Sequence, residues 1–249
     1  MPRGDEAVQV LRRQAQILDC FSASRPRLRA ADVRAETGLP ASTVARILKS
    51  LLEENLIQRQ GDQYSIGLRV MAWSAAATAG SDLIRAGEPA LLALRDVSRE
   101  TCILYVRQAA FRVAVLIAHS EQAIIYQGWL GQILPLGGGA AGKVFMAFDP
   151  DALEAARVQG FKAFTANTIT DKRALDDELV RVRANGWAYS PQERVIGLSS
   201  LAAPVVNSRG VTVAAVAIGA PSFRLGDEDA RALVAPLKEC VQRISGQLP

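Results

Sequence analysis

Histidine and cysteine are scarce in this chain. Its 249 residues contain one histidine, His119, and three cysteines, Cys20, Cys102 and Cys240, whose separations match no metal-binding spacing. A single histidine leaves a serine-histidine triad only one candidate base. Three widely separated cysteines without a signal peptide are typical of reduced thiols in the cytoplasm. We therefore expect no bound metal, no cofactor and a cytoplasmic location.

Long apolar runs are also missing. The longest, VAVLIA (113–118) and VAAVAIGA (213–220), have the length of strands and are too short to cross a bilayer. The start of the chain, MPRGDEAV (1–8), contains acidic residues and lacks the apolar centre of a secretory signal. Hydrophobic residues still make up 49% of the chain, enough to build ordinary packed cores, so we expect no association with a membrane.

Neither sign of charge dominates. The net charge is +4, and basic residues exceed acidic ones by two in residues 1–66 and by two in the remainder. An overall charge of this size does not identify a nucleic-acid-binding domain. The placement of the basic residues along the chain must decide that question.

Two helices are expected at the start of the chain. Apolar residues three or four positions apart, among them Leu11 and Leu18, predict an amphipathic helix over 8–21. A polar break follows, and LRAADVRAET (28–37) predicts a second, shorter helix. Gly38 suits the position after that helix, where the backbone commonly takes a positive φ.

The segment 40–54 predicts the clearest helix of the chain. Its apolar residues fall at positions i, i+3, i+4, i+7 and i+8, and they are Val44, Ile47, Leu48, Leu51 and Leu52. The other side of its first turns carries polar and basic residues, which are Ser42, Thr43, Arg46 and Lys49. Acidic residues occur only at its far end. A helix that enters the major groove of DNA needs this distribution, because phosphates repel acids.

A hairpin completes this first module. LIQRQGDQYSIG (56–67) predicts two short strands around a tight turn, and a hairpin after such helices is typical of a winged helix-turn-helix. Arg29, before the second helix, and Arg59, in the hairpin, are candidates for contacts to the DNA backbone. A small helical module that binds a protein or RNA partner is the alternative interpretation.

The rest of the chain predicts an α+β domain behind an alanine-rich linker helix over 68–87. We divide the chain into a winged helix-turn-helix (1–67), a linker (68–84) and a second domain (85–249). Strands are expected over 101–108, 112–119, 123–130, 200–206 and 211–219. Helices are expected over 88–99, 142–148, 151–157, 171–185 and 227–247. Strands and helices segregated in this way favour one mixed or antiparallel sheet.

The stretch GGGAAGKV (137–144) resembles a phosphate-binding loop, but its last position is Val144, where a hydroxyl would bind Mg²⁺. The helix after it is cut short at Asp149-Pro150, and no apolar strand ends in the acidic residue that nucleotide hydrolysis requires. We therefore predict no nucleotide hydrolysis. Glycines that open a helix still expose N–H groups at the positive end of the helix dipole, which suits a carboxylate.

Three motifs in order resemble the isocitrate lyase regulator (IclR) family of bacterial transcriptional regulators over nearly the whole chain. They are GLPASTVARILKSL with YSIG, GWLGQILPLGGGAAGKVFMA, and NGWAYSPQERVIGLSSLAAPVVNSRGVTVAAVAI. The resemblance implies a GAF-like or profilin-like effector-binding domain and binding to a palindromic double-stranded DNA operator as a homodimer or tetramer. It also implies a small carboxylate or aromatic effector, held by Gly128, Gly138, Gly139, Ala140, Gly142, Glu193, Ser199, Leu201, Ala202 and Ile218.

Two positions depart from the family pattern. The chain has Gln192-Glu193 where two acids are usual, and alanines where a threonine is common in the glycine-rich run. Effector identity therefore does not follow from the resemblance. An enzyme is the weaker alternative, since Gly197-Leu198-Ser199-Ser200-Leu201 lacks the closing glycine of a hydrolase nucleophile elbow. We predict a ligand-responsive regulator, either a repressor or an activator of a metabolic operon.

Overall fold

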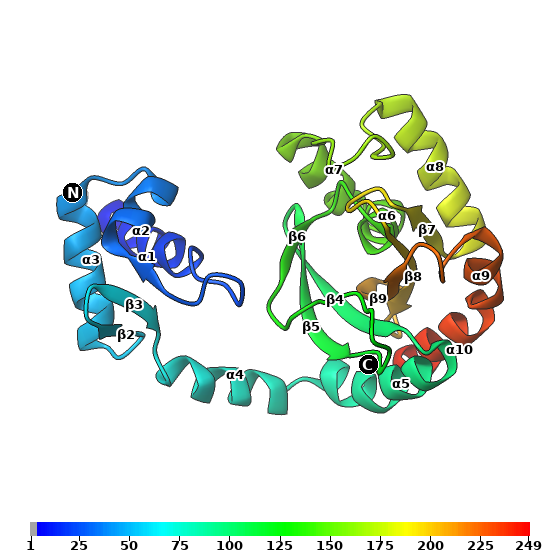
Figure 1. The fold of residues 1–249 in the computed structure, drawn as a ribbon, viewed down its shortest axis with the longest axis horizontal. Helices are drawn as coiled ribbons and strands as arrows, with labels where there is room; N and C mark the ends of the chain where they lie inside the picture. Colours follow the sequence, from blue (N-terminus) through cyan, green and yellow to red (C-terminus); the bar gives the residue numbers. More distant parts are fainter. Residues whose placement is uncertain (1–3) are drawn as a thin grey trace. The chain divides into compact units, whose positions relative to one another are not determined.

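The chain divides into two compact units, one ending at Gly80 and the other spanning Ser81–Pro249 (Figure 1). The computed structural model describes the backbone of residues 4–249 and the side chains from Gln9 onward. Residues 1–3 lie outside the described part, as do the side chains of residues 4–8, including Val8 at the start of the predicted first helix. None of the described helices is long and apolar enough to span a bilayer.

The first unit is a winged helix-turn-helix, as predicted. Its helices are α1 (Gly4–Leu18), α2 (Ala30–Thr37) and α3 (Ala41–Glu53), and its strands are β1 (Leu28–Arg29), β2 (Ile57–Gln60) and β3 (Gln63–Ile66). The strands form an antiparallel sheet in the order β1-β3-β2. Gly38 has φ 67 and its N–H donates to Arg34 O, so the predicted left-handed end of the second helix is confirmed.

Two details of this unit differ from expectation. Leu11 of α1 is 68% exposed, whereas Ile17 is fully buried, so the apolar side of α1 is rotated from the predicted one. Leu28 and Arg29 form a strand because they pair with Tyr64 and Gln63 of the hairpin, and the second helix therefore begins at Ala30. In both cases contacts with the rest of the unit decide which residues are buried.

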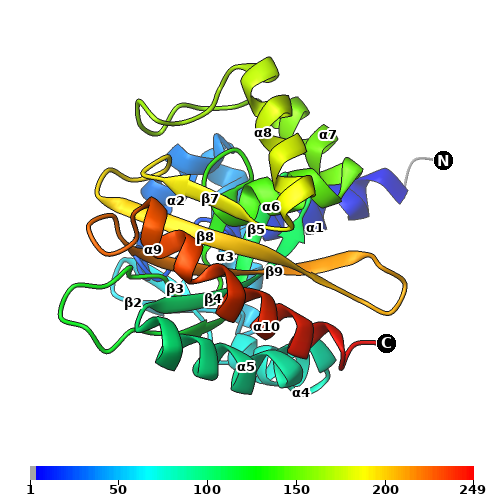
Figure 2. The ribbon, with the colours of Figure 1, turned by 90° about the vertical axis from the view of Figure 1, so that its right-hand side faces the viewer.

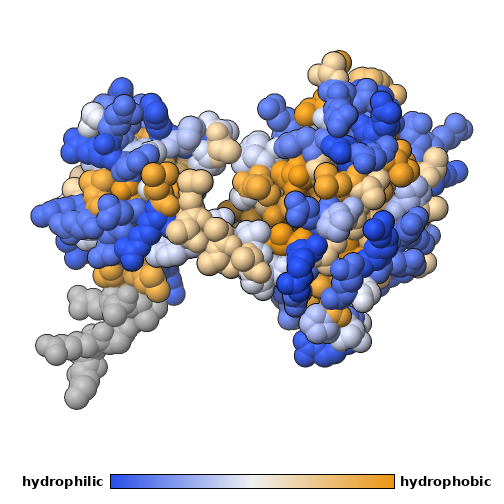
Figure 3. Space-filling view, turned by 90° about the horizontal axis from the view of Figure 1, so that it is seen from below, coloured by the Kyte–Doolittle hydropathy of each residue, from blue (hydrophilic) through white to orange (hydrophobic). Residues whose placement is uncertain are grey.

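The single helix predicted over 68–87 is wrong. The chain forms α4 (Arg69–Ala79) and α5 (Asp82–Ser98), separated at Gly80–Ser81, and α5 runs through the expected start of a new helix at Glu88. The Ser81 side chain accepts a hydrogen bond from Ile84 N, which caps α5. No residue of α4 is buried; Met71 is 67% and Trp73 53% exposed. Figure 3 shows the alanine-rich surface of this segment in pale orange.

The second unit contains one antiparallel six-stranded sheet in the order β6-β5-β4-β9-β8-β7. The strands are β4 (Thr101–Gln108), β5 (Phe111–Ala118), β6 (Ile133–Pro135), β7 (Ala188–Pro191), β8 (Leu198–Val206) and β9 (Thr212–Pro221). Four of the five predicted strands are confirmed. β6 and β7, the two edge strands, were not predicted.

The strand predicted over 123–130 is wrong. This segment is irregular, although its residues favour strands, because specific contacts hold it away from the sheet. Arg224 donates a 2.7 Å hydrogen bond to Ile124 O, and backbone bonds to β5 resume only at Gly131, whose N–H donates to Ala114 O. Ile124 and Leu130 point to solvent, with 61% and 65% exposure. The segment instead contributes Tyr126 to a cavity described below.

Helices cover both faces of this sheet (Figure 2). They are α5, α6 (Ala140–Phe148), α7 (Pro150–Gln159), α8 (Lys172–Asn185), α9 (Asp227–Ala232) and α10 (Val234–Ser245). One core lies between the sheet and α5 with α10, and contains Leu201 and Ile218. The other lies between the sheet and α6 with α8, and contains Phe145 and Leu179. The helix predicted over 227–247 is broken at Leu233.

Candidate ligand cavity and DNA-binding helix

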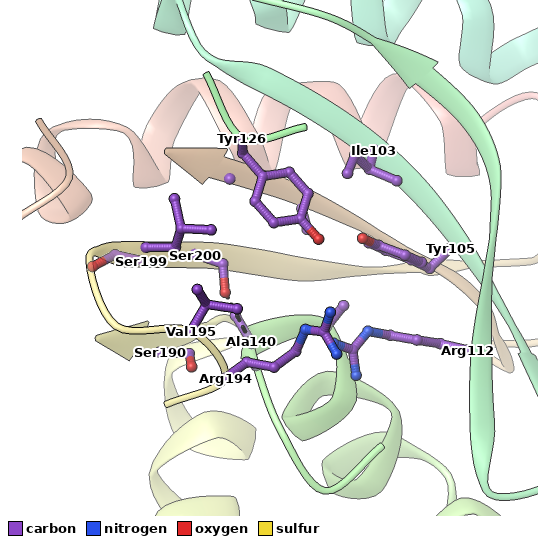
Figure 4. A pocket seen from close by; sticks show the side chains of 15 residues that line it. Ile103, Tyr105, Arg112, Tyr126, Ala140, Ser190, Arg194, Val195, Ser199 and Ser200 are labelled. Carbon is purple, nitrogen blue, oxygen red and sulfur yellow. Dashed lines mark hydrogen bonds between the residues drawn. The ribbon is translucent and has the colours of Figure 1, made fainter. Parts of the chain in front are cut away.

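A cavity of about 50 Å³ lies between the first turn of α6 and the sheet (Figure 4). A single buried water needs a cavity volume of roughly 10–15 Å³. A cavity of the present volume therefore suits a small organic molecule and not a nucleotide. Its polar lining consists of Tyr105, Arg112, Tyr126, Ser190, Arg194, Ser199 and Ser200. Its remaining lining consists of Ile103, Gly139, Ala140, Ala141, Val195, Leu198, Ala217 and Gly219.

Arg112, near the start of β5, is the most deeply buried charged residue of the cavity, with 3% exposure. Its Nη1 donates to Pro135 O at 2.5 Å and its Nη2 to Gly138 O at 2.7 Å. The guanidinium lies 5.4 Å from the ring centre of Tyr105. Burial lowers the pKa of Arg112, and Nε has no hydrogen-bond partner among the described residues.

The glycine-rich run makes room for this guanidinium. A Cβ atom at Gly139 would lie 3.0 Å from Arg112 Nη2, and one at Gly142 would lie 2.9 Å from Nη1 and 2.0 Å from Leu136 O. Gly139 also has φ 90, which other residues rarely adopt. The glycines that resemble a phosphate-binding loop therefore allow the backbone to pack closely around a buried arginine.

A second arginine extends into the same cavity. Arg194 lies beside Arg112, and in Figure 4 the two guanidinium groups are adjacent. Their mutual repulsion contributes to the lowered pKa of Arg112, after the larger effect of burial. No aspartate or glutamate among the described residues lines the cavity. Two cations, one buried and one half-buried, therefore share a small cavity without a carboxylate in its lining to neutralise them.

The opposite end of the cavity is aromatic and apolar. Tyr105 and Tyr126 point their hydroxyls toward one another (Figure 4), and burial raises the pKa of Tyr105. The phenol of Tyr105 is therefore neutral near pH 7. Gly219 of β9 lets the Tyr126 ring approach, since a Cβ there would lie 3.0 Å from that ring. A bound molecule would meet cations at one end and aromatic surface at the other.

Helix α6 is also tied to the sheet at its first turn. The Ser200 hydroxyl, on β8, accepts a 3.2 Å hydrogen bond from Ala140 N. One of the free N–H groups that open the helix is thus satisfied by a side chain. The sequence predicted that the start of this helix alone would suit a carboxylate. In the structure, the two arginines supply most of the positive charge beside it.

Lys143 has no access to the cavity, although it occupies the lysine position of the phosphate-loop pattern. Its Nζ donates to Glu178 Oε1 at 3.0 Å, to Glu193 Oε1 at 2.5 Å and to Tyr189 O at 3.0 Å. Burial raises the pKa of Glu193 despite Lys143. Burial also acts to raise the pKa of Glu178, but Lys143 and Arg181 together outweigh it and the pKa is lowered. All three donor positions of the ammonium are occupied.

Three of the ten residues expected to hold an effector line the cavity: Gly139, Ala140 and Ser199. Gly128, Gly138 and Gly142 lie directly behind lining side chains, next to Tyr126, Arg194 and Arg112 respectively. Four others are not in the lining. Glu193 is directed to Lys143, Leu201 and Ile218 belong to the core on the α5 face of the sheet, and Ala202 is packed under α6.

No sequence pattern pointed to the two arginines or Tyr105 as ligand-binding residues. The only local signal for Arg112 is a basic residue at the start of a strand that is otherwise apolar, and buried arginines are rare. Arg194 lies in a polar loop and carries no local signal. Their meeting depends on the pairing of strands and not on any motif.

In the first unit, α3 presents its polar side to solvent. Ser42, Arg46 and Lys49 are exposed and Thr43 is half-buried, while Val44, Ile47, Leu48 and Leu51 are buried. Arg46 forms no ion pair with any described residue, and Lys49 Nζ lies 3.8 Å from Glu53. The exposed side of α3 is therefore cationic near its start.

The two other candidate basic residues have contacts at the hairpin. Arg29 Nε lies 2.9 Å from Asp62 Oδ2 at the hairpin turn. Arg59 stacks 5.6 Å from the ring centre of Tyr64 and donates to Gly61 O. Both side chains remain accessible to solvent. Arg59 lies on the hairpin, which is the wing of this fold, and Arg29 lies beside it on β1.

Comparison with known proteins identifies the family. The model for the C-terminal part of bacterial IclR transcriptional regulators matches residues 75–246, and the model for the IclR helix-turn-helix domain matches residues 10–61. The chain belongs to the IclR family. It is a DNA-binding transcriptional regulator, and its curated relatives are regulators and not enzymes.

Several IclR-family relatives match nearly the full chain. The glycerol operon regulatory protein of Streptomyces griseus is 30% identical over 97% of this chain and 96% of its own length. The repressor AllR of Escherichia coli (strain K12) is 26% identical, covering 91% of this chain and 85% of its own. Both matches include the helix-turn-helix and the second unit.

Solved IclR-family structures share the fold. The regulator from Alicyclobacillus acidocaldarius has a TM-score of 0.85 at 23% identity, covering 98% of this chain and 99% of that one. An IclR homologue from Microbacterium hydrocarbonoxydans, solved with 4-hydroxybenzoate, has a TM-score of 0.79 at 20% identity, covering 96% and 98%. At these identities the likeness concerns the fold alone.

Proposed function

We propose that this regulator changes its binding to DNA when a small organic acid occupies the cavity of the second unit. The observation that supports this is the adjacency of Arg112 and Arg194 in a lining without carboxylates. A buried guanidinium beside a second cation is costly when no carboxylate is near, and an anion relieves that cost. The family relative that binds 4-hydroxybenzoate offers a precedent for an acid of this kind.

The effector contacts in this proposal come from several elements. The acid group meets Arg112 and Arg194 beside the first turn of α6, formed by Gly139 and Ala140. Ser199 borders the same space on β8. Tyr105 and Tyr126 cover the carbon part, which suits either an aliphatic chain or an aromatic ring.

The DNA contacts in this proposal come from α3 and the wing. Ser42, Thr43, Arg46 and Lys49 read the major groove of a palindromic operator, while Arg29 and Arg59 contact its phosphates. The working form is a homodimer or tetramer in the cytoplasm. The exposed apolar side of α4 (Leu68, Met71 and Trp73) supports such assembly, since apolar surface of this kind is usually covered by a partner.

Two measurements on the full chain test the proposal. A thermal-shift screen with small carboxylates and aromatic acids should give a stabilising ligand, since a molecule that binds only the folded state raises the melting temperature. That ligand should then change the mobility shift of a duplex from the protein's own promoter region. Equal binding to promoter and random duplex would contradict the regulator, and the absence of any stabilising acid would contradict the cavity.

A further inference from the structure

The charge of the cavity indicates what kind of ligand it binds. This inference rests on the proposed function. The lining holds two guanidinium groups and no carboxylate of the described chain. The pKa of Tyr105 is raised by burial, so its phenol supplies no negative charge near neutral pH. The cavity therefore carries two positive charges before any ligand enters.

The nearest acidic residues do not neutralise this charge. Glu193 precedes Arg194 in the chain, but its carboxylate does not line the cavity and lies 2.5 Å from Lys143 Nζ, which it already neutralises. Glu178 also binds Lys143, at 3.0 Å. The backbone carbonyl of Glu193 accepts hydrogen bonds from Thr165 and Thr168, which fixes the start of the loop that carries Arg194.

Arg112 is held in the cavity by hydrogen bonds to two backbone carbonyls, and Gly139 and Gly142 pack against its guanidinium. Its Nε has no hydrogen-bond partner in the described part of the chain, although the side chain is almost completely buried. Arg194 is held less tightly, since its side chain is half-buried and forms no hydrogen bond or ion pair with any described residue. The site thus combines one fixed and one adjustable guanidinium.

We propose that the ligand carries two acid groups separated by only a few carbon atoms. One carboxylate accepts hydrogen bonds from Arg112 and the other from Arg194, and a carboxylate pairs well with the planar fork of a guanidinium. The two groups must be close together in the ligand because the two guanidinium groups are adjacent (Figure 4). Ile103 and the ring of Tyr126 cover its carbon chain. A monoacid leaves one of the two cations without an anion.

Matched pairs of acids test this inference on the full-length protein. Succinate and butyrate both have four carbons, and phthalate and benzoate share a ring, but each pair differs by one acid group. Calorimetric titration at pH 8 and constant ionic strength compares molecules whose acid groups are all ionised. We expect the diacid of at least one pair to bind 10-fold or more tightly than its monoacid.

The two proposals fail differently in this experiment. If the monoacid of each pair binds as tightly as the diacid, the requirement for two acid groups is wrong, while the cavity remains an effector site. If none of the four acids binds, both the inference and the proposed carboxylate cavity are contradicted. Tighter binding by a diacid supports both.

A charge-matched pair of variants tests whether the preference for a diacid over its monoacid depends on the cavity. Arg194→Gln removes the adjustable guanidinium and should reduce the diacid-to-monoacid affinity ratio to about one. Arg209→Gln makes the same charge change in the exposed turn between β8 and β9 and should leave the ratio unchanged. Equal effects of the two variants, or an unchanged ratio in Arg194→Gln, would overturn the inference. Arg112 is left intact because it holds the backbone of the glycine-rich run.

Discussion

The ammonium of Lys143 lies 2.5 Å from the carboxylate of Glu193, and both side chains are buried. This contact joins the start of α6 to the loop after β7, and Glu178 of α8 adds a second carboxylate at 3.0 Å. The pair thus anchors the residue that precedes Arg194. It also explains why a sequence that resembles a phosphate-binding loop keeps its lysine, since the lysine neutralises acids of its own domain.

Replacing Lys143 by Met should destabilise the second unit by about 3–5 kcal/mol, because the carboxylates of Glu178 and Glu193 lose their cation in a buried site. Denaturant unfolding followed by tryptophan fluorescence measures this. The deficit should shrink as the pH falls from 7 to 5, since burial already raises the pKa of Glu193 and protonation removes the unpaired charge. Lys172→Met, on the exposed start of α8, is the control and should change stability by less than about 0.5 kcal/mol.

Arg46→Ala should weaken operator binding by about 1–3 kcal/mol if Arg46 contacts a base, with little change on random duplex. Arg59→Ala should weaken binding to operator and random duplex equally and should reduce the salt dependence, as expected of a phosphate contact. Mobility shifts at several salt concentrations separate the two patterns. An equal loss on all sequences in Arg46→Ala would assign that residue to phosphate instead.

Gly142→Ala should unfold or strongly destabilise the second unit, because the new Cβ would lie 2.0 Å from Leu136 O and 2.9 Å from Arg112 Nη1. We expect a loss of roughly 3 kcal/mol or more, at the large end of single substitutions. Gly80→Ala is the control, since its Cβ would meet only Ala76 O, at 3.5 Å, and φ there is −84. A normal melting temperature in Gly142→Ala would show that the run tolerates a side chain and is not packed around Arg112.

The Cys240 thiol should make the stability of the protein depend on pH in mild alkali. Burial raises the pKa of Cys240 from 9.0 to about 12, so the unfolded thiol ionises first. The folded state then holds more protons than the unfolded state, and stability falls as the pH rises above 9. Relative to Cys240→Ala, the wild type should lose about 1 kcal/mol between pH 8 and pH 10. A difference that does not vary with pH over this range would contradict the prediction.

Local patterns in the sequence were sufficient for much of the fold. The apolar spacing from Val44 to Leu51 predicted α3 and its exposed polar side, and Gly38 marked the end of α2. Alternation and β-branched runs predicted β4, β5, β8 and β9. These features depend on residues within one or two turns of each other, so they are visible in the order of the residues.

The cavity was decided by the tertiary structure. Arg112 is on β5 and Arg194 follows β7, and they meet only because the order β6-β5-β4-β9-β8-β7 curls around α6. For the same reason the sequence did not show that Glu193 faces Lys143, or that Tyr126 leaves the expected strand to line the cavity. The sequence by itself determined the regulator family, helix α3 with its exposed polar side and most of the strands, because periodicity and motifs act locally. Which charges share one enclosed space, and which acids are already paired, followed from the packing of distant segments, which no local pattern encodes.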